Sequence, residues 1–260
     1  TLSALGALLL CSQAALESAR AGLNLCAQMI VPSLLPFFIL SSLLQQLGLP
    51  GILGRWLSPV TQKLFGIGGA GASALLLGVT GGYPLGADAV ARLRRSGALT
   101  REQAERALAF CNNSGPGFFL GVAGGMVLDS IPAGLALYGI HVLSALCAGV
   151  LLASRDVPRA ALKKLRPQEP PALSRAFSEA VSGSCAALLQ ISGLVIFFTA
   201  MTALLQRALP ALPAQGLLTG LLELTSGITQ LTGDWNTRFL CCAFLLSWGS
   251  VCVHFQASGL

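Results

Sequence analysis

Long apolar runs, each ended by a few polar, glycine or proline residues, make up most of the chain. Residues 21–47, 134–153 and 184–209 each have the length that crosses a bilayer, about 20 residues or more. Pro32 and Pro36 lie inside the first run, so we expect a kink there. This pattern predicts an all-α, polytopic membrane protein.

Two further apolar runs are too short to cross a bilayer comfortably. Residues 65–79 lead into the glycine-rich segment 80–83, and residues 83–93 then continue into a basic stretch. Basic residues flank this pair at both ends, which favours the same side of the membrane for both. We therefore expect a re-entrant helical hairpin over about residues 65–95. The preceding residues, 51–64, mix basic and apolar side chains as an interfacial helix does.

A helix over about residues 101–127 is interrupted in its middle. Thr100 followed by Gln103 is typical of its start, and the sequence Cys-Asn-Asn-Ser-Gly-Pro-Gly occupies residues 111–117. Breaks are rare inside a bilayer because unpaired backbone groups are costly there. Where a helix does break, the freed N–H and C=O groups usually line a cavity that binds a solute or an ion.

The second half of the chain repeats this order at low identity. A polar linker over residues 154–171 separates a first repeat, residues 1–153, from a second, residues 172–260. In the second repeat we expect a hairpin over about residues 214–235 and a broken transmembrane helix over about residues 238–258. An ordinary bundle of kinked helices would explain the glycines but not the repeated order.

The distribution of positive charge predicts an orientation. Cytoplasmic loops are enriched in Lys and Arg, so we expect the basic loops to be cytoplasmic. Counting crossings from them makes the first hairpin enter from the inside and the second from the outside. The chain would then be an inverted repeat, which is typical of secondary transporters. The basic clusters contain Arg55 and Lys63; Arg92, Arg94, Arg95, Arg101 and Arg106; and Arg155, Arg159, Lys163, Lys164, Arg166 and Arg175.

Composition narrows the possible functions. Of the 260 residues, 54% are hydrophobic and 10% are charged, with a mean hydropathy of +0.74, whereas soluble domains carry about 25% charged residues. The net charge of +6 comes without interleaved aromatic residues, so nucleic-acid binding is not expected. The eight cysteines lie in apolar segments without metal-ligand spacing and are interpreted as buried small side chains. No paired-histidine motif, nucleophile elbow or phosphate-binding loop is present, so we expect no enzyme activity, cofactor or metal.

The first hairpin tip and the first helix break offer neutral hydrogen-bonding groups. Amides and hydroxyls can hold a polar solute without a buried charge, although interhelical hydrogen bonding is an alternative role for them. At the tip, glycine lets the backbone approach a ligand, and a helix that begins at Pro84 can offer free N–H groups to an anion. A tight turn without a ligand is the alternative there. The expected solute contacts are Thr80, Gly81, Gly82, Tyr83, Asn112, Asn113, Ser114 and Gly115.

Glu223 is the candidate for ion coupling in the second repeat. It precedes Thr225, Ser226 and Gly227, where we expect the second tip. An ionisable side chain inside a membrane is costly and is therefore a functional candidate. It could carry a coupling proton or help to hold Na⁺, and a hydrogen bond to a neighbouring helix backbone is the alternative. The further solute-binding candidates of this repeat are Thr225, Ser226, Ser247, Ser250, His254 and Gln256, whereas His141 lies in a plain apolar span and receives no role.

Four segments are similar to those of a known membrane-protein family. They are Pro32-Ser-Leu-Leu-Pro-Phe-Phe38, Gly81-Gly-Tyr-Pro-Leu-Gly86, residues 104–116 and Trp248-Gly-Ser-Val-Cys-Val-His-Phe-Gln256. They resemble the YlbJ (SpoVV) family of sporulation integral membrane proteins, and the likeness covers nearly the whole chain. That family belongs to the nucleoside-recognition or gate-domain group, which is related in plan to concentrative nucleoside transporters. The resemblance implies movement of dipicolinic acid across a forespore membrane during sporulation.

These observations together predict a secondary transporter of a small, polar, anionic solute such as dipicolinate, with H⁺ or Na⁺ as the coupling ion. The membrane would be a bacterial cell membrane or a forespore membrane. Expected partners are the solute and the lipid bilayer, and a homo-oligomer is left open. The alternatives are a non-transporting sporulation membrane assembly factor and a nucleoside carrier. The first tip lacks the carboxylate that a nucleoside transporter would carry there. Because Thr1 is not methionine, we expect the natural sequence to begin upstream.

Overall fold

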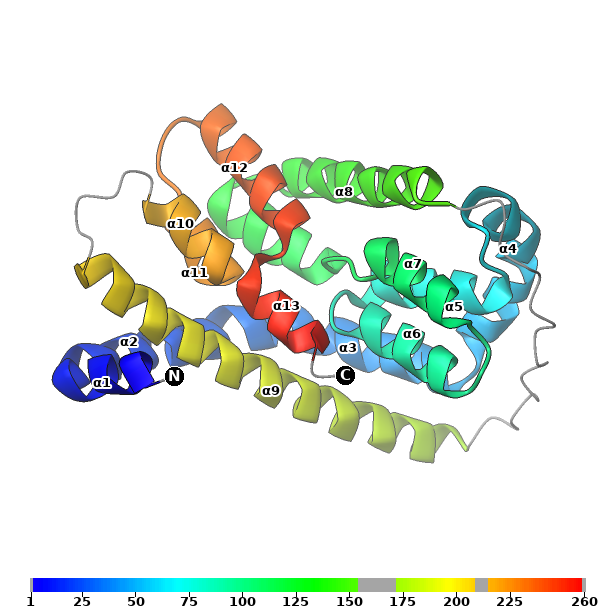
Figure 1. Cartoon of the computed structure of the whole chain (residues 1–260), viewed down its shortest axis with the longest axis horizontal. Coiled ribbons are helices and arrows are strands. Elements are labelled where there is room, and N and C mark those ends of the chain that lie inside the picture. Colours follow the sequence, from blue (N-terminus) through cyan, green and yellow to red (C-terminus); the bar gives the residue numbers. More distant parts are fainter. Residues whose placement is uncertain (1, 154–171, 209–214, 259–260) are drawn as a thin grey trace. The chain divides into compact units, whose positions relative to one another are not determined.

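The computed structural model describes residues 2–153, 172–208 and 215–258, and in this part of the chain every regular element is a helix (Figure 1). Four helical segments are long and apolar enough to cross a membrane: Ser12–Gln46, Ile131–Leu151, Leu173–Ala208 and Trp235–Ser258. The prediction of an all-α, polytopic membrane protein is confirmed. The predicted linker, residues 154–171, lies outside the described residues.

The long N-terminal span changes its winding near the two prolines. It consists of α2 (Ser12–Leu25), the π-helical turn η1 (Cys26–Ile30) and α3 (Val31–Gln46), after the short α1 (Leu2–Leu10). Proline has no N–H to donate to the preceding turn, and a π-helical turn is a common local adjustment of this kind. The expected distortion of this helix therefore takes the form of a π-helical turn just before Pro32.

The chain divides into two compact units. Unit 1 comprises Thr1–Leu35, Gly117–Leu135 and Cys185–Gly259, and unit 2 comprises Pro36–Pro116, Ala136–Ser184 and Leu260. The helices α3, α8 (Ile131–Leu151) and α9 (Leu173–Ala208) contribute residues to both units.

Unit 2 contains the predicted first hairpin. The helix α4 (Leu49–Phe65) is followed by α5 (Gly69–Gly81), and the two meet at an angle of 96°. Next come α6 (Leu85–Arg95) and α7 (Arg101–Cys111), with the Thr100 hydroxyl accepting from the Gln103 N–H in the predicted helix start. Buried apolar side chains join these helices, among them Phe65, Leu77, Val90, Leu99 and Phe110.

The helices α5 and α6 lie antiparallel, and α7 lies against both (Figure 1). They cross where Gly78 faces Gly86, and a Cβ on either glycine would overlap the carbonyl oxygen of Cys111 at the end of α7. With 13 and 11 residues, α5 and α6 are about 20 and 16 Å long, whereas the hydrocarbon layer is about 30 Å thick. Neither arm of the pair is long enough to cross a bilayer alone.

Unit 1 contains the predicted second hairpin, formed by α10 (Gln215–Leu222) and α11 (Leu224–Thr229). These short helices cross at Gly220 and Gly227, which leave no room for a Cβ between them. The expected turn at residues 225–227 is wrong, because these residues lie inside α11 and the chain turns at Glu223. Gly227 lies at the crossing of α10 and α11 and not at the turn, and the carboxylate of Glu223 caps α11.

Both predicted broken helices are interrupted. Residues 112–115 separate α7 from the π-helical segment η2 (Phe118–Val127). In unit 1, Gly249, with a φ of 84°, separates α12 (Trp235–Trp248) from α13 (Ser250–Ser258). Asp234 caps α12, and hydrogen bonds from Thr237 lower the pKa of its carboxyl group. Each unit thus contains a glycine-crossed hairpin and one helix break. The inverted relation between the repeats stays a prediction.

Candidate functional site

The tip of the first hairpin is a tight turn made possible by glycine. Gly82 has φ 78° and ψ −175°, a conformation open essentially to glycine alone. The Tyr83–Pro84 peptide bond is cis, and α6 starts directly after it. Gly81 and Gly82 are buried, and Tyr83 is half-buried. The Thr80 side chain is exposed and its hydroxyl donates to the Leu76 carbonyl at 2.8 Å, so this predicted contact is engaged in its own helix.

The first tip and the first break, separate in the sequence, are in contact. A Cβ on Gly82 would lie 2.5 Å from the nitrogen and 2.7 Å from the Cα of Gly115. A Cβ on Gly115 would in turn lie 3.0 Å from the carbonyl oxygen of Gly81. The two motifs singled out by the sequence therefore form one locus in unit 2, with backbone touching backbone.

Two polar atoms at this locus have no visible partner. The Oδ1 of Asn112 and the Oγ of Ser114 are buried, and neither has a hydrogen-bond partner among the described residues. The whole Ser114 residue is only 1% exposed. Buried polar groups are almost always paired, and leaving one unpaired costs about 1–3 kcal/mol. A polar ligand or ordered water beside the break would satisfy both atoms.

Asn113, in contrast, already has a local role. Its Nδ2 donates to the Phe110 carbonyl at 2.8 Å. The break frees that carbonyl, because the helix does not continue to supply an N–H. Asn113 therefore closes the end of α7, which is a structural role beside the predicted solute contact.

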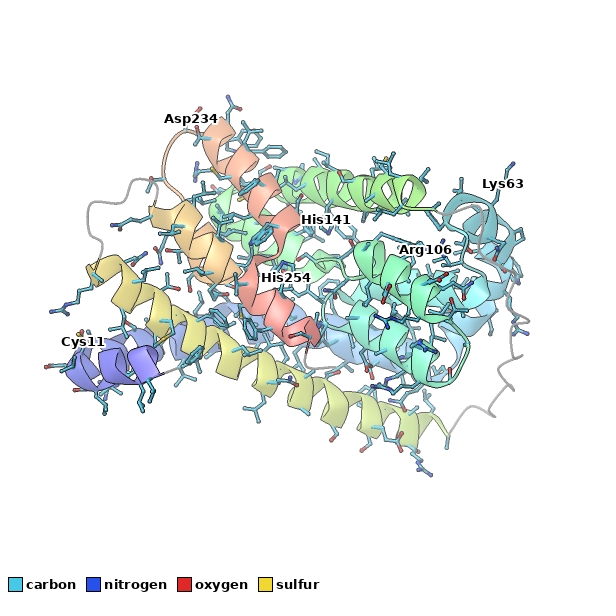
Figure 2. The ribbon with its side chains drawn as sticks, in the orientation of Figure 1. Cys11, Lys63, Arg106, His141, Asp234 and His254 are labelled. Atoms are coloured by element: carbon cyan, nitrogen blue, oxygen red, sulfur yellow. The ribbon has the colours of Figure 1, made fainter. Side chains whose placement is uncertain are left out.

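The helix α8 supplies two contacts that the sequence analysis missed. The Tyr138 hydroxyl donates to the Val79 carbonyl at 2.8 Å, one residue before the first tip. One turn further on, Nε2 of His141 accepts from the Ser114 N–H at 3.3 Å. Figure 2 labels His141 on α8. The sequence did carry a signal for these contacts. Tyr138 and His141 are hydrogen-bonding residues three positions apart in a mostly apolar helix, and this spacing places them on one helix face.

In unit 1, the carboxylate of Glu223 caps α11. Its oxygens accept from the Thr225 N–H at 3.0 Å and from the Ser226 N–H at 2.6 Å. Glu223 is 2% exposed, and none of the salt bridges among the described residues involves it. The Ser226 hydroxyl lies 3.1 Å from that of Thr199 on α9. The structure thus shows a buried carboxylate bound to backbone N–H groups.

The four candidates around the second break differ in their surroundings. Ser250 is buried with a φ of 77°, and its Oγ accepts from the Val253 N–H at 3.3 Å. Gln256 is buried, its Nε2 lies 3.6 Å from the Cys252 sulfur, and its Oε1 has no partner among the described residues. Ser247 is exposed and bonds back to the Ala243 carbonyl at 2.8 Å. His254 is exposed beside Trp248, so Ser247 and His254 are not brought to the buried groups.

Comparison with known proteins agrees with the sequence resemblance. Residues 27–128 match the family model named Gate and described as nucleoside recognition. In an alignment 289 positions long, the chain is 29% identical to the sporulation integral membrane protein YlbJ of Bacillus subtilis (strain 168). This alignment covers 95% of the chain and 71% of YlbJ. The predicted resemblance is confirmed. No solved structure matches the chain.

The Gate match includes both parts of the locus in unit 2. Residues 27–128 contain the first hairpin, its tip and the first break. The chain is an integral membrane protein, and the segment that is similar to the Gate model contains a hairpin tip in contact with a helix break.

Proposed function

We propose that this protein is a secondary transporter of a small, polar, anionic solute. The observation that carries the proposal is the contact between the first tip and the first break, where Asn112 and Ser114 keep buried polar atoms without partners. Helices broken inside a membrane usually expose backbone groups to a bound substrate or ion. Movement of the tip away from the break would open this locus, and its return would close it.

The Ser114 hydroxyl and the N–H groups of the Asn112 amide suit a carboxylate, whereas Oδ1 of Asn112 is an acceptor and needs a donor such as ordered water. Amide and hydroxyl hydrogens are donors, and the first turn of α6 begins directly after the tip, so its end of the helix dipole favours an anion. An aromatic dicarboxylate of the dipicolinate type is our preferred solute. This choice is supported by the resemblance to the sporulation protein YlbJ. We likewise propose that the protein lies in a bacterial cell membrane or forespore membrane during sporulation, with its basic loops in the cytoplasm.

Glu223 is our candidate for ion coupling in unit 1. Its buried carboxylate has no cationic partner among the described residues, and Thr225 and Ser226 approach it with backbone donors. A proton could neutralise it, or Na⁺ could take oxygen ligands from it and from nearby hydroxyls. The capping hydrogen bonds alone are the structural alternative.

A nucleoside carrier is the second candidate, because the Gate match is described as nucleoside recognition. Neutral amides can also bind a nucleobase or ribose. The two candidates differ in the charge of the solute, so competition between them is decisive.

Uptake by proteoliposomes tests the proposal. The purified full chain is reconstituted, and accumulation of radiolabelled dipicolinate is followed under H⁺ and Na⁺ gradients, with unlabelled uridine as competitor. We expect uptake that uridine does not reduce, that Asn112→Ala lowers, and that the exposed control Asn236→Ala leaves unchanged. Uridine-sensitive uptake would favour the nucleoside carrier. No accumulation of dipicolinate, or of radiolabelled uridine in a parallel assay, would favour an assembly factor.

A further inference from the structure

Two side chains replace one helical hydrogen bond at the first break. In an uninterrupted helix the Ser114 N–H would donate to the Phe110 carbonyl, four residues earlier. Here that carbonyl accepts from Nδ2 of Asn113 at 2.8 Å, and the Ser114 N–H donates to Nε2 of His141 at 3.3 Å. Asn113 and His141 therefore hold the two ends of the lost bond apart. The break is a defined arrangement instead of a loose turn.

The hydrogen bond fixes the protonation of His141 in this arrangement. A ring nitrogen that accepts a hydrogen bond carries no proton, so the imidazole is neutral with its proton on Nδ1. If Nε2 gains a proton, it becomes a donor, and it then faces the Ser114 N–H across 3.3 Å. Two donors that face each other need an acceptor beside both. A carboxylate supplies two acceptor oxygens and a negative charge.

We propose that His141 takes up a proton together with the solute, and that the imidazolium and the Ser114 N–H then bind one carboxylate group of that solute. The inference rests on the proposed function, because it adds a proton-binding residue at the solute locus itself, beside the ion-coupling candidate Glu223 in unit 1. Ser114 also contributes a hydroxyl that is buried without a partner among the described residues. The proton on His141 would compensate one negative charge of the solute inside the membrane.

The surrounding elements carry several other titratable groups, and the charged ones on α6 and α7 are Asp88, Arg92, Arg94, Arg95, Arg101, Glu102, Glu105 and Arg106. The break follows Cys111 of α7, the tip contains Tyr83, and α8 itself contributes Tyr138, whose hydroxyl donates to Val79. Further along α6, Asp88 is paired with Arg92 at 2.7 Å. His141 is thus the one group at the break whose ordinary titration lies near neutral pH.

Equilibrium binding of radiolabelled dipicolinate to the purified full chain tests this inference. Between about pH 7 and about pH 8, an ordinary histidine is mostly neutral and carboxylic acids are ionised. Uptake of one proton per solute should therefore weaken binding up to about tenfold over this unit, by linkage. In His141→Gln, the amide oxygen can still accept from Ser114 but cannot gain a proton, so binding should be independent of pH. The matched control is His254→Gln, since the chain has two histidines and His254 is exposed on α13 (Figure 2).

The possible outcomes separate the inference from the proposed function. Wild-type binding that weakens with pH, lost in His141→Gln and kept in His254→Gln, supports both. Binding that keeps its pH dependence in His141→Gln, or that shows none in the wild type, overturns the role of His141 and leaves the solute site standing. Absence of binding at every pH in a folded, monodisperse wild type overturns the proposed solute and the inference together. Size-exclusion chromatography of each variant checks the fold.

Discussion

Replacing Gly82 by alanine should separate the first tip from the first break. Alanine at φ 78° and ψ −175° costs about 1–3 kcal/mol in backbone strain. Its Cβ would also lie 2.5 Å from the Gly115 nitrogen and 2.7 Å from the Gly115 Cα. Such overpacking costs about 1–3 kcal/mol more, and it cannot be relieved by rotating a side chain because both contacts are backbone atoms. We expect a total loss of about 2–6 kcal/mol if the contact persists.

The alternative is that the tip retreats. Non-bonded carbon atoms approach to about 3.5–4.0 Å at their optimum, so relieving the clash moves the tip by about 1 Å. In that case the protein keeps more of its stability but loses the closed locus, and solute binding weakens. Both responses distinguish Gly82→Ala from the wild type, one by stability and the other by affinity.

Thermal unfolding in detergent, followed by size-exclusion chromatography with fluorescence detection, measures the first response. For a chain of this size, a change of 1 kcal/mol shifts the melting temperature by about 2–4 °C, so Gly82→Ala should melt about 4–24 °C lower. The matched control is Gly183→Ala on α9, where a Cβ would meet nothing within 4 Å. We expect it to melt at or slightly above the wild-type temperature. If Gly82→Ala melts and binds dipicolinate like Gly183→Ala, the tip-to-break contact is not as described.

Three further variants test individual residues. Asn112→Ala should weaken dipicolinate binding about 5- to 150-fold, equivalent to about 1–3 kcal/mol. Its melting temperature should change little, because the Oδ1 of Asn112 has no partner to lose among the described residues. Unchanged affinity in a binding assay would mean that the solute binds elsewhere. In the absence of solute, Asn113→Ala should lower the free energy of unfolding by about 1–3 kcal/mol, because it leaves the Phe110 carbonyl unpaired. A wild-type melting temperature would refute the structural role of Asn113. Glu223→Gln should raise the Na⁺ requirement of proteoliposome uptake if Glu223 helps to hold Na⁺, or remove a pH dependence of uptake if Glu223 carries a coupling proton. Uptake with unchanged Na⁺ and pH dependence would leave Glu223 with its capping role alone.

The sequence indicates the helices and their breaks well because membrane burial constrains both. Apolar length predicts the spans. The sequence Asn-Asn-Ser-Gly-Pro-Gly separates α7 from η2 by removing or redirecting backbone hydrogen bonds. Thr100 and Gln103 are similarly local, since a helix start is determined by a few adjacent residues. These features depend on short stretches of sequence, so they can be predicted without knowing which residues pack against them.

The position of the second turn and the hydrogen bonds of α8 depend on tertiary contacts, which the local sequence does not specify. Gly227 resembles a turn residue in the sequence, but it faces Gly220 across a helix crossing, and the turn falls on Glu223 because its carboxylate can cap α11. His141 and Tyr138 contact residues 27 and 59 positions away, respectively. No local pattern specifies such partners. The inverted relation of the two repeats likewise depends on long-range arrangement and stays a prediction.

A cryo-electron microscopy structure of the full chain in lipid nanodiscs, with saturating dipicolinate, tests the central claim most directly. We predict solute density beside the contact of the first tip with the first break, within hydrogen-bonding distance of Asn112 and Ser114, and an α5–α6 pair that enters and leaves on one face of the bilayer. Solute density away from this locus, or an α5–α6 pair that crosses the membrane completely, would contradict the account.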